Sequence, residues 1–404
     1  MDYTKKNSKE FVLVCCVIFL AMSCVAVEAS SLGVFNVMQF GAIADGTKDN
    51  TEAFGAAWKA ACEWKGPSSL VIPEGTFLVG PVLFKGPCPN ASPVVVQVKG
   101  KVKASTDMSK YPSDDWIVFQ YVDGLLLTGG GTFDGQGASA WSLNQCPKKA
   151  HCKLLPTSLK FSFITNGAIR GINSVDSKLF HMLLFGCKNM EVQSIKISAP
   201  ADSPNTDGIH IGSSSNITIS RSQIGTGDDC ISLGPGSTQV TVDNVFCGPG
   251  HGISVGSLGK RPNEGDVEGL HVKNCTISDT TNGLRIKTWE DSDSSSASNF
   301  TYEDIVMNNV ANPIIIDQEY CPYASCSHKG PSRVKINNIS FKNIRGTSTS
   351  KVAVNLLCSR AFPCENVKLD DIKLKYNDQG EDSTASCTNV NGVSAGVQIP
   401  PTCL

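Results

Sequence analysis

Charge of either sign is scarce in this 404-residue chain: 18% of the residues are charged, and 35 basic side chains stand against 37 acidic ones. The formal charge of −2 creates no global field that would attract nucleic acid or an anionic membrane surface. Disordered chains need high net charge or low hydrophobicity, and this sequence has neither. We therefore expect a folded protein that binds no nucleic acid.

Helical periodicity and tight hairpin signals are also nearly absent. Asn-Gly and Asp-Gly pairs, which favour two-residue hairpin turns, are few, and this weighs against a large β-sandwich, the alternative all-β fold. One stretch, EAFGAAWKAACEW, has the pattern of an amphipathic helix, and Asn50 or Thr51 can cap it. Its apolar face carries Phe54, Ala57, Trp58 and Ala61.

A degenerate strand pattern recurs through the second half of the chain. Each copy has apolar residues two apart, a small or polar break, and a second short apolar pair. The seven copies, 23 to 34 residues apart, begin at Asn189, Asn216, Gln239, Gly269, Asn299, Arg333 and Asn366. The break is often Asn, which tolerates the left-handed conformation that a corner requires.

Such variable spacing is typical of the coils of a parallel β-helix, in which each coil has a common strand core and its own loop. A stack of coils leaves an unpaired edge at each end. We expect the amphipathic helix to cap the N-terminal edge, and the loop between Cys387 and Cys403 to cover the other. Residues 30–404 would then form a single domain.

The N-terminus has the order of a secretory signal peptide over residues 1–29. Lys5, Lys6 and Lys9 precede an uncharged stretch from Phe11 to Val27, and small residues at Val27 and Ala29 suit cleavage. A membrane anchor is the alternative, since this stretch can just span a thin bilayer. We expect a secreted protein that leaves the membrane after cleavage.

Fourteen of the 17 cysteines lie beyond residue 29, an even number, as a disulfide framework in an oxidising compartment needs. Close pairs that can bridge locally are Cys146/Cys152, Cys321/Cys326, Cys358/Cys364 and Cys387/Cys403. No two short Cys-x-x-Cys units occur, so zinc is not expected. Glycosylation sequons, which fit secretion, start at Asn216, Asn274, Asn299 and Asn338.

Residues able to carry chemistry gather in four short motifs: NTDG from Asn205, GDDC from Gly227, GHG from Gly250 and RIK from Arg285. Asp207 precedes Asp228 by 21 residues, and His251 follows at a similar interval, close to one short coil. If the coils stack, these groups lie above one another on one face, about 4.8 Å apart per coil. Singly, each motif is better explained as a turn, a solvated strand or a calcium ligand pair. Together they indicate a site.

Three adjacent carboxylates repel, and proteins use such pairs where one group holds a proton and another does not. Paired carboxyls flanking a sugar bond are the usual apparatus of glycoside hydrolysis. Nearby cations, Arg285 and Lys287 with Lys260 and Arg261, can restore local charge balance and bind an anionic sugar. This combination predicts a glycosidase that acts on an acidic polysaccharide.

In this order and spacing the four motifs resemble those of the polygalacturonases, the pectin-hydrolysing glycosidases. The likeness begins at FNVMQFGA, residues 35–42, and runs to the C-terminal cysteines. The stretches SPNTDGIHI, GPGHGISVGSLGK, RIKTWE and IIIDQEYCP look most like plant pollen-type members, many of which act from chain ends. The resemblance implies a right-handed parallel β-helix that hydrolyses α-1,4-linked galacturonan with inversion, without cofactor or metal, from the non-reducing end.

The resemblance also implies roles for individual residues. Asp228 would be the general acid, and Asp207 and Asp229 would hold and activate the attacking water. His251 would tune the protonation of the acid. The substrate would be bound by Arg285, Lys287, Tyr320 and Asn205. Because neighbouring residues of a strand face opposite sides, the chain must bend near Gly227 for both aspartates to serve one site.

We thus expect a monomeric extracellular enzyme of the cell wall whose partner is polygalacturonate. Endo action, a calcium-dependent pectate lyase-like β-helix and a non-catalytic wall-binding protein are the alternatives. The loop Asn144–Ser158 matches no family feature, so its role is left open. The histidines outside the motifs are expected to be structural: His151, His181, His210 and His271, with His328 in a loop.

Overall fold

The computed structural model describes residues 31–146, 152–323, 326, 330–377 and 381–404. The expected signal peptide, residues 1–29, and two of the remaining histidines, His151 and His328, lie outside these residues. From Leu32 to Leu404 the chain forms one compact unit. No helix among the described residues is long and apolar enough to cross a membrane.

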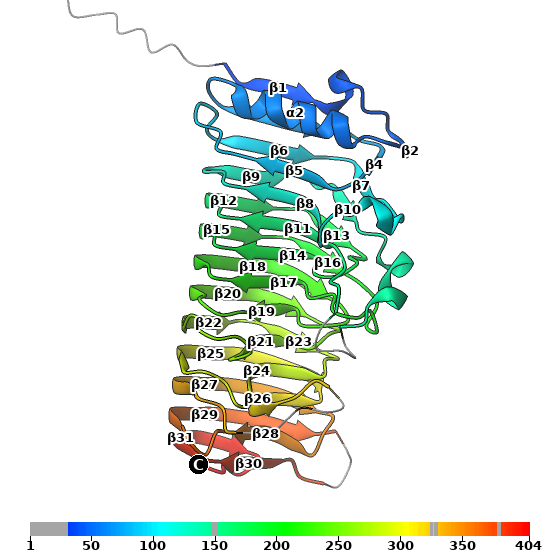
Figure 1. Ribbon diagram of the computed structural model, residues 1–404. Helices are drawn as coiled ribbons and strands as arrows, with labels where there is room; N and C mark the ends of the chain where they lie inside the picture. The colour runs from blue at the N-terminus through cyan, green and yellow to red at the C-terminus, as the bar shows by residue number, and fades with distance from the viewer. Residues whose placement is uncertain (1–30, 147–151, 324–325, 327–329, 378–380) are drawn as a thin grey trace, which may run out of the picture. The chain divides into compact units, whose positions relative to one another are not determined.

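Short parallel strands stack coil upon coil along one axis, in two sheets (Figure 1). The 11-stranded sheet consists of β5 (Val82–Lys85), β8 (Asp115–Gln120), β11 (Thr157–Ser162), β14 (Met182–Phe185), β17 (Ile209–Gly212), β19 (Ile231–Leu233), β21 (Ile253–Leu258), β24 (Asn282–Trp289), β26 (Asn312–Tyr320), β28 (Val352–Leu357) and β30 (Thr384–Thr388).

The 20-stranded sheet bends around the rest of each coil. It consists of β1 (Gly33–Asn36), β2 (Asp45–Asp49), β3 (Ser68–Ile72), β4 (Thr76–Val79), β6 (Val94–Val98), β7 (Lys101–Ala104), β9 (Leu125–Thr128), β10 (Thr132–Asp134), β12 (Thr165–Arg170), β13 (Asn173–Val175), β15 (Lys188–Gln193), β16 (Lys196–Ser198), β18 (Ser215–Gly225), β20 (Thr238–Cys247), β22 (Val267–Lys273), β23 (Thr276–Ser278), β25 (Ser295–Val310), β27 (Val334–Ser348), β29 (Cys364–Tyr376) and β31 (Val390–Ile399). The described residues also form four short 3-10 helices: η1 (Val37–Phe40), η2 (Met108–Lys110), η3 (Gly137–Ser139) and η4 (Trp141–Leu143).

The expected right-handed parallel β-helix is confirmed. Every one of the seven copies of the strand pattern has a left-handed residue at its break: Ser194, Arg221, Asn244, Asn274, Asp304, Asn338 and Asp371. The polar break therefore marks the corner where the 20-stranded sheet bends, as predicted.

Apolar side chains stack in register through the interior of the β-helix. On the 11-stranded sheet, Ile209 pairs with Ile231, Ile231 with Ile253, and Ile253 with Leu284, and all four are buried. Truncating such a side chain to Ala typically costs about 2–5 kcal/mol. Because side chains alternate, the residues between them point outward, and this is where the polar groups of the site are found.

The helix α2 (Thr51–Glu63) caps the N-terminal end, as expected (Figure 1). Phe54 and Trp58 are buried on its inner face, and the Trp58 ring lies 5.1 Å from that of Phe84 on β5. Asn50 occupies the N-cap position, as predicted, but its side chain makes no capping hydrogen bond. The Asn50 amide instead bonds the backbone of residues 43, 48 and 78, and Thr51 Oγ1 accepts from the Gly80 N–H, so both side chains tie the start of the helix to neighbouring backbone.

Disulfides form at all four predicted local pairs, and two more link Cys62 to Cys88 and Cys230 to Cys247. Cys187 and Cys275 are buried free thiols, so the even cysteine count does not mean complete pairing. Cys187 Sγ instead lies 3.4 Å from the carbonyl oxygen of Phe161, and Cys275 Sγ lies 3.1 Å from that of Lys273. Among the described residues no helix covers the C-terminal end, and the Cys387–Cys403 bridge closes the chain there.

Candidate active site

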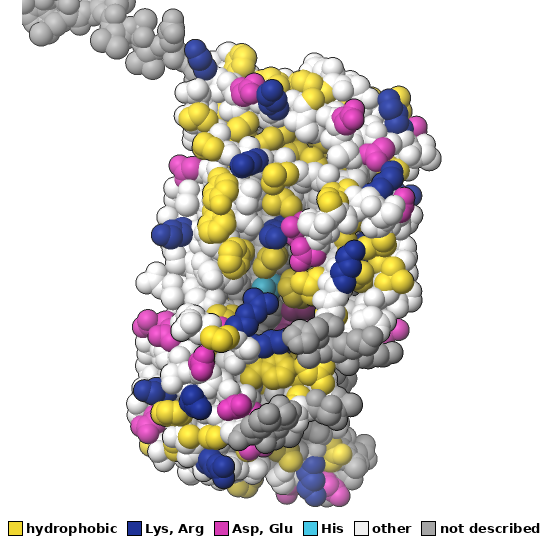
Figure 2. Space-filling view, in the orientation of Figure 1, with side chains coloured by type: hydrophobic (Ala, Val, Ile, Leu, Met, Phe, Trp, Pro, Cys, Tyr) yellow, Lys and Arg dark blue, Asp and Glu magenta, His cyan; other side chains and the backbone are white. Residues whose placement is uncertain are grey.

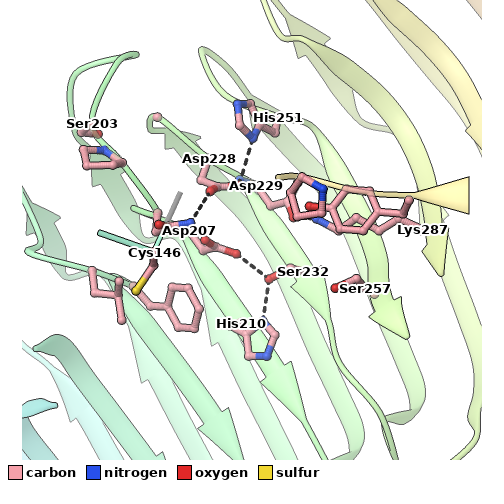
Figure 3. A pocket seen from close by; sticks show the side chains of 18 of the residues that line it. Cys146, Ser203, Asp207, His210, Asp228, Asp229, Ser232, His251, Ser257 and Lys287 are labelled. Atoms are coloured by element: carbon pink, nitrogen blue, oxygen red, sulfur yellow. Dashed lines mark hydrogen bonds and ion pairs between the residues drawn. The ribbon is translucent and has the colours of Figure 1, made fainter. Parts of the chain in front are cut away.

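The four motifs converge on one pocket of about 670 Å³ at the edge of the 11-stranded sheet. Asp207 precedes β17, Asp228 and Asp229 precede β19, and His251 precedes β21, so consecutive coils deliver them to the same edge (Figure 3). All eight residues expected in the site line this pocket: Asn205, Asp207, Asp228, Asp229, His251, Arg285, Lys287 and Tyr320. Figure 2 shows Lys and Arg side chains gathered at a hollow midway along this face, with acidic and histidine side chains inside it.

The two adjacent aspartates lie between strands, where alternation does not apply. β18 ends at Gly225 and β19 begins at Ile231, with the chain bending at Gly227 and Asp228. A Cβ added at Gly227 would lie 2.0 Å from the carbonyl oxygen of Ser203, so only glycine fits this approach. The bend expected near Gly227 is therefore present, as a break between two strands instead of a bulge within one.

Asp229 is the most strongly held carboxylate. Its side chain is 1% exposed and accepts hydrogen bonds from Ser254 (2.7 Å), Arg285 (2.7 Å) and Lys287 (2.8 Å). Burial alone would raise the pKa of Asp229, but the charges of Lys287 and Arg285 outweigh it and hold that pKa below 3.8. Asp229 is therefore ionised whenever the protein is folded near neutral pH.

Asp207 has the opposite environment. It is buried, and Ser232 Oγ donates to its Oδ2 at 2.9 Å. Burial and the neighbouring charges of Asp228 and Asp229 raise the pKa of Asp207 well above 3.8. A carboxylate with a raised pKa takes up a proton more readily, as a general base must.

Asp228 lies at the mouth of the site with its side chain 17% exposed. Its Oδ1 is 3.0 Å from His251 Nδ1, and its Oδ2 accepts from the Asn205 amide at 3.1 Å. Asn205 is in turn bonded by the amide of Asn144. The polar contacts fix the direction of the Asp228 carboxyl and leave it open to a bound substrate.

Cationic and aromatic side chains form the wall of the pocket on the side of β24. Lys287 Nζ lies 5.4 Å from the centre of the Tyr320 ring, and the Tyr320 and Trp289 rings meet edge to face at 5.5 Å. Lys260 Nζ lies 5.2 Å from the Trp289 ring and 3.4 Å from the Tyr323 hydroxyl. Lys260 has no carboxylate partner among the described residues, whereas Arg261, expected to join it, does not line the pocket.

Asp228, Asp229 and His251 are spaced closely enough to ligate a metal ion, with ligand atoms within 4.8 Å of one another. Both oxygens of Asp229, however, already accept bonds from cationic side chains. A divalent cation would lie against Arg285 and Lys287, whose charges repel it. The donor set fits an anionic or neutral ligand better than a metal.

Sequence reasoning missed His210 and Ser232. His210 was expected to be structural, but it lies on β17, lines the pocket and is 2.7 Å from Ser232 Oγ (Figure 3). The signal was available: His210 follows Asp207 by three residues and alternates with the buried Ile209 and Ile211. His181 and His271 do lie outside the pocket, bonded to Ser174 and Glu303 respectively.

The loop whose role was left open also reaches the pocket. Cys146 and Cys152, joined by a disulfide, and Leu154 line it, and the Asn144 amide donates to the carbonyl of Pro204. The described parts of this loop, residues 144–146 and 152–158, therefore shape the pocket.

The profile of the glycosyl hydrolases of family 28 matches residues 62–398. The chain is 49% identical to an exopolygalacturonase of Platanus acerifolia, covering 92% of this chain and 98% of that one, and 47% identical to an exopolygalacturonase of Zea mays, covering 90% and 89%. Among solved structures, an endo-xylogalacturonan hydrolase of Aspergillus tubingensis superposes with a TM-score of 0.78 at 26% identity, over 91% of this chain and all of that one. A polygalacturonase of Erwinia carotovora shares the fold, with a TM-score of 0.73 at 24% identity over 92% of this chain and 99% of that one.

Proposed function

This chain belongs to the glycosyl hydrolases of family 28, and we propose that it is an exo-acting polygalacturonase that releases galacturonate from the non-reducing end of α-1,4-linked galacturonan with inversion. The exo assignment is supported by relatives named exopolygalacturonases at 47–49% identity over most of both chains. The observation that carries the hydrolase assignment is the unequal environment of three adjacent carboxyls in one pocket.

The proposed reaction has an acid and a base on opposite sides of the sugar bond. Asp228, the most exposed of the three, donates its proton to the glycosidic oxygen as the bond to the anomeric carbon breaks. Water attacks the anomeric carbon from the other face, and its proton passes to Asp207, whose raised pKa suits a base. Asp229 remains ionised beside its two cations and orients the water. Acid and base exchange protons with solvent before the next cycle.

Substrate binding is proposed to use the wall formed by β24 and β26. Arg285 donates Nε to Ser254 and one terminal nitrogen to Asp229, which leaves its remaining N–H groups for a substrate carboxylate. Lys287 likewise uses one of three donors on Asp229. Tyr320 offers an aromatic face to a sugar ring, and Asn205 reaches the site from the opposite edge.

Product analysis on polygalacturonate tests this function. Monomer released from the first minutes indicates exo action, whereas a ladder of oligomers indicates endo action. We expect Asp228→Asn to lose at least about two orders of magnitude in kcat, the usual contribution of a general acid. The exposed Asp293→Asn, outside the pocket, should keep wild-type activity.

The same assay separates the alternatives. A calcium-dependent lyase would form an unsaturated, ultraviolet-absorbing product and would stop when a chelator is added. A wall-binding protein without catalysis would bind polygalacturonate equally well before and after Asp228→Asn, with no new reducing ends from either. New reducing ends, no ultraviolet signal and insensitivity to chelator support hydrolysis.

We also propose that the protein is a secreted monomer of the cell wall. Six disulfides support an oxidising compartment. The sequon asparagines are all exposed: Asn216, Asn274, Asn299 and Asn338. Expression of the full chain in plant cells should place the protein in the medium or wall, with an N-terminus after Ala29, and light scattering should give the monomer mass. Retention in the membrane fraction would favour an anchor instead.

A further inference from the structure

A column of polar side chains crosses the outer face of the 11-stranded sheet beneath the carboxyls. His210 on β17 is in register with Ser232 on β19, which is in register with Ser254 on β21, and Ser254 with Arg285 on β24. The two serines each bond a different carboxyl of the site: Ser232 bonds Asp207, and Ser254 bonds Asp229. They therefore occupy equivalent positions one coil apart.

The partner behind each serine is different, and this changes what each hydroxyl can do. Behind Ser254 is the Nε of Arg285, at 3.0 Å, which can only donate. The Ser254 hydrogen must therefore point to Asp229, which favours its ionised form. Behind Ser232 is His210 Nδ1, at 2.7 Å, and a neutral imidazole nitrogen can either donate or accept.

Two hydrogen-bond arrangements follow for His210, Ser232 and Asp207. With the imidazole hydrogen on Nδ1, His210 donates to Ser232, and Ser232 donates to an ionised Asp207. With the hydrogen on Nε2, Nδ1 accepts from Ser232, and Ser232 accepts from a protonated Asp207. In each arrangement both hydrogen bonds of the row His210–Ser232–Asp207 have one donor and one acceptor. Each charge state of Asp207 therefore has its own complete hydrogen-bond network.

We propose that His210 and Ser232 form a relay behind Asp207 which changes direction as Asp207 takes up and loses the proton of the attacking water. This proposal rests on the function proposed above and makes His210 and Ser232 positioning residues, since they act on the water only through Asp207, which takes its proton. When Asp207 gains the water proton, the Ser232 hydroxyl rotates and His210 changes tautomer by exchange with solvent. No proton is gained or lost by the pair itself.

The surroundings keep His210 neutral, as the relay requires. Its ring stacks on Phe180 at 5.1 Å, and burial lowers its pKa to about 4, against the smaller opposing effect of Asp229. The charged groups that face this region are Asp207, Asp228, Asp229, Arg285 and Lys287, with Asp202 and His251 elsewhere on the pocket wall. The carboxylates Asp228 and Asp229 raise the pKa of His210 and the ammonium of Lys287 lowers it, so the effects of these charges oppose one another.

Kinetics of three variants test the relay. Ser232→Ala removes the hydroxyl, His210→Phe keeps a ring against Phe180 but removes Nδ1, and His210→Asn keeps a polar nitrogen near the Nδ1 position. We expect the acidic limb of the kcat/KM profile on polygalacturonate to move up by about one pH unit in Ser232→Ala, because ionised Asp207 loses its donor. His210→Phe should move the limb in the same direction, because the Ser232 hydroxyl then donates to Asp207 without the Nδ1–H donor behind it. His210→Asn should restore much of the wild-type limb, and the control His271→Gln, which is remote from the pocket, should not change it.

The form of the loss separates a relay from a merely structural role. A uniform fall in activity at all pH values, with the acidic limb in its wild-type place, would overturn the relay. So would an acidic limb that moves equally in His210→Phe and His210→Asn. Circular dichroism identifies any variant that has failed to fold.

A second measurement does not depend on activity. Imidazole ¹⁵N NMR of the full chain should show His210 changing from the Nε2–H to the Nδ1–H tautomer as pH rises through the ionisation of Asp207, and Asp207→Asn should abolish that change. One unchanging tautomer at all pH values would refute the relay even if polygalacturonate is hydrolysed. A wild-type protein that releases no galacturonate but shows the tautomer change would refute the proposed function alone.

Discussion

Lys287→Met should destabilise the fold in a way that depends on pH, because it removes one of two cations beside the buried Asp229 carboxylate. Methionine keeps an unbranched stem of similar length but lacks the ammonium, so the change removes the 2.8 Å bond to Asp229 and the cation–π contact with the Tyr320 ring. Isolating a buried charge costs about 3–5 kcal/mol. Arg285 and Ser254 still bond Asp229, so we expect only the contribution of one charge-assisted bond, about 1.5–3 kcal/mol at pH 7.

The sign of the pH dependence follows from the lowered pKa of Asp229. A carboxyl whose folded pKa lies below its unfolded value adds stability above that unfolded value, and this stability is lost as pH falls towards the folded pKa. Without Lys287 the folded pKa of Asp229 rises. The difference between wild type and variant should therefore be largest near pH 7 and should shrink below about pH 4, where the unfolded carboxyl is protonated.

Urea unfolding at pH 7, 5 and 3.5 measures this difference, with Lys342→Met on the exposed surface as the matched control. For a unit of this length, 1.5–3 kcal/mol corresponds to a fall in Tm of about 2–4 °C. In a double-mutant cycle, Lys287→Met should cost less when Asp229→Asn is already present, because no charge is then left short of a partner. A loss of unfolding free energy that is independent of pH, or no larger than that of the control, would refute the conclusion that Lys287 stabilises the ionised Asp229.

Three further outcomes are expected. Lys260→Met should raise KM for polygalacturonate about 5- to 10-fold with little change in kcat, because the ammonium over Trp289 has no carboxylate partner in the described part of the chain. The rise should shrink in high salt, and steady-state kinetics at two salt concentrations measure this. Gly227→Ala should lower the activity and should lower the free energy of unfolding by at least about 2 kcal/mol, because the added Cβ would collide with the carbonyl oxygen of Ser203. A variant with wild-type values of both would contradict the close approach of Gly227 to Ser203. Thiol titration of the chain lacking residues 1–29 should find no reactive thiol before unfolding and two afterwards, because burial raises the pKa of Cys187 to about 11 and that of Cys275 to about 12.

The fold was largely predictable because every coil requires the same pattern of residues. Apolar residues two apart must face the interior, and a residue that tolerates left-handed backbone must occupy the corner. These requirements show at all seven copies, whether the corner holds Asn274, Asp304 or Arg221. The apolar face of α2 predicted that this helix covers the N-terminal end. The hydrogen bonds of Asn50 at the start of the helix were not predictable, because the Asn50 amide bonds Leu78 on β4, which is far away in the sequence.

The site was predictable to the extent that its residues stand in motifs separated by one coil. Asp207, Asp228 and His251 met that condition. Ser232 did not, because a lone serine in a strand carries no signal until its neighbour in the next coil is known. Register between coils depends on loop lengths that vary from coil to coil, and only the structure shows that Ser232 pairs with His210 on one side and Ser254 on the other.

Strand register also explains how three carboxyls can lie together and behave differently. On a strand, moving one residue turns every outward side chain inward, so the column from His210 to Arg285 exists only in this register. Within it, Asp229 lies nearer the cationic end and is held ionised, while Asp207 lies three coils from Arg285 at the histidine end and is free to take a proton. The net charge of the chain is irrelevant to this difference. A one-residue insertion ahead of Ser232 in β19 should leave the motifs intact in sequence yet turn Ser232 inward, away from Asp207 and His210, while Ser254 on β21 keeps its bond to Asp229.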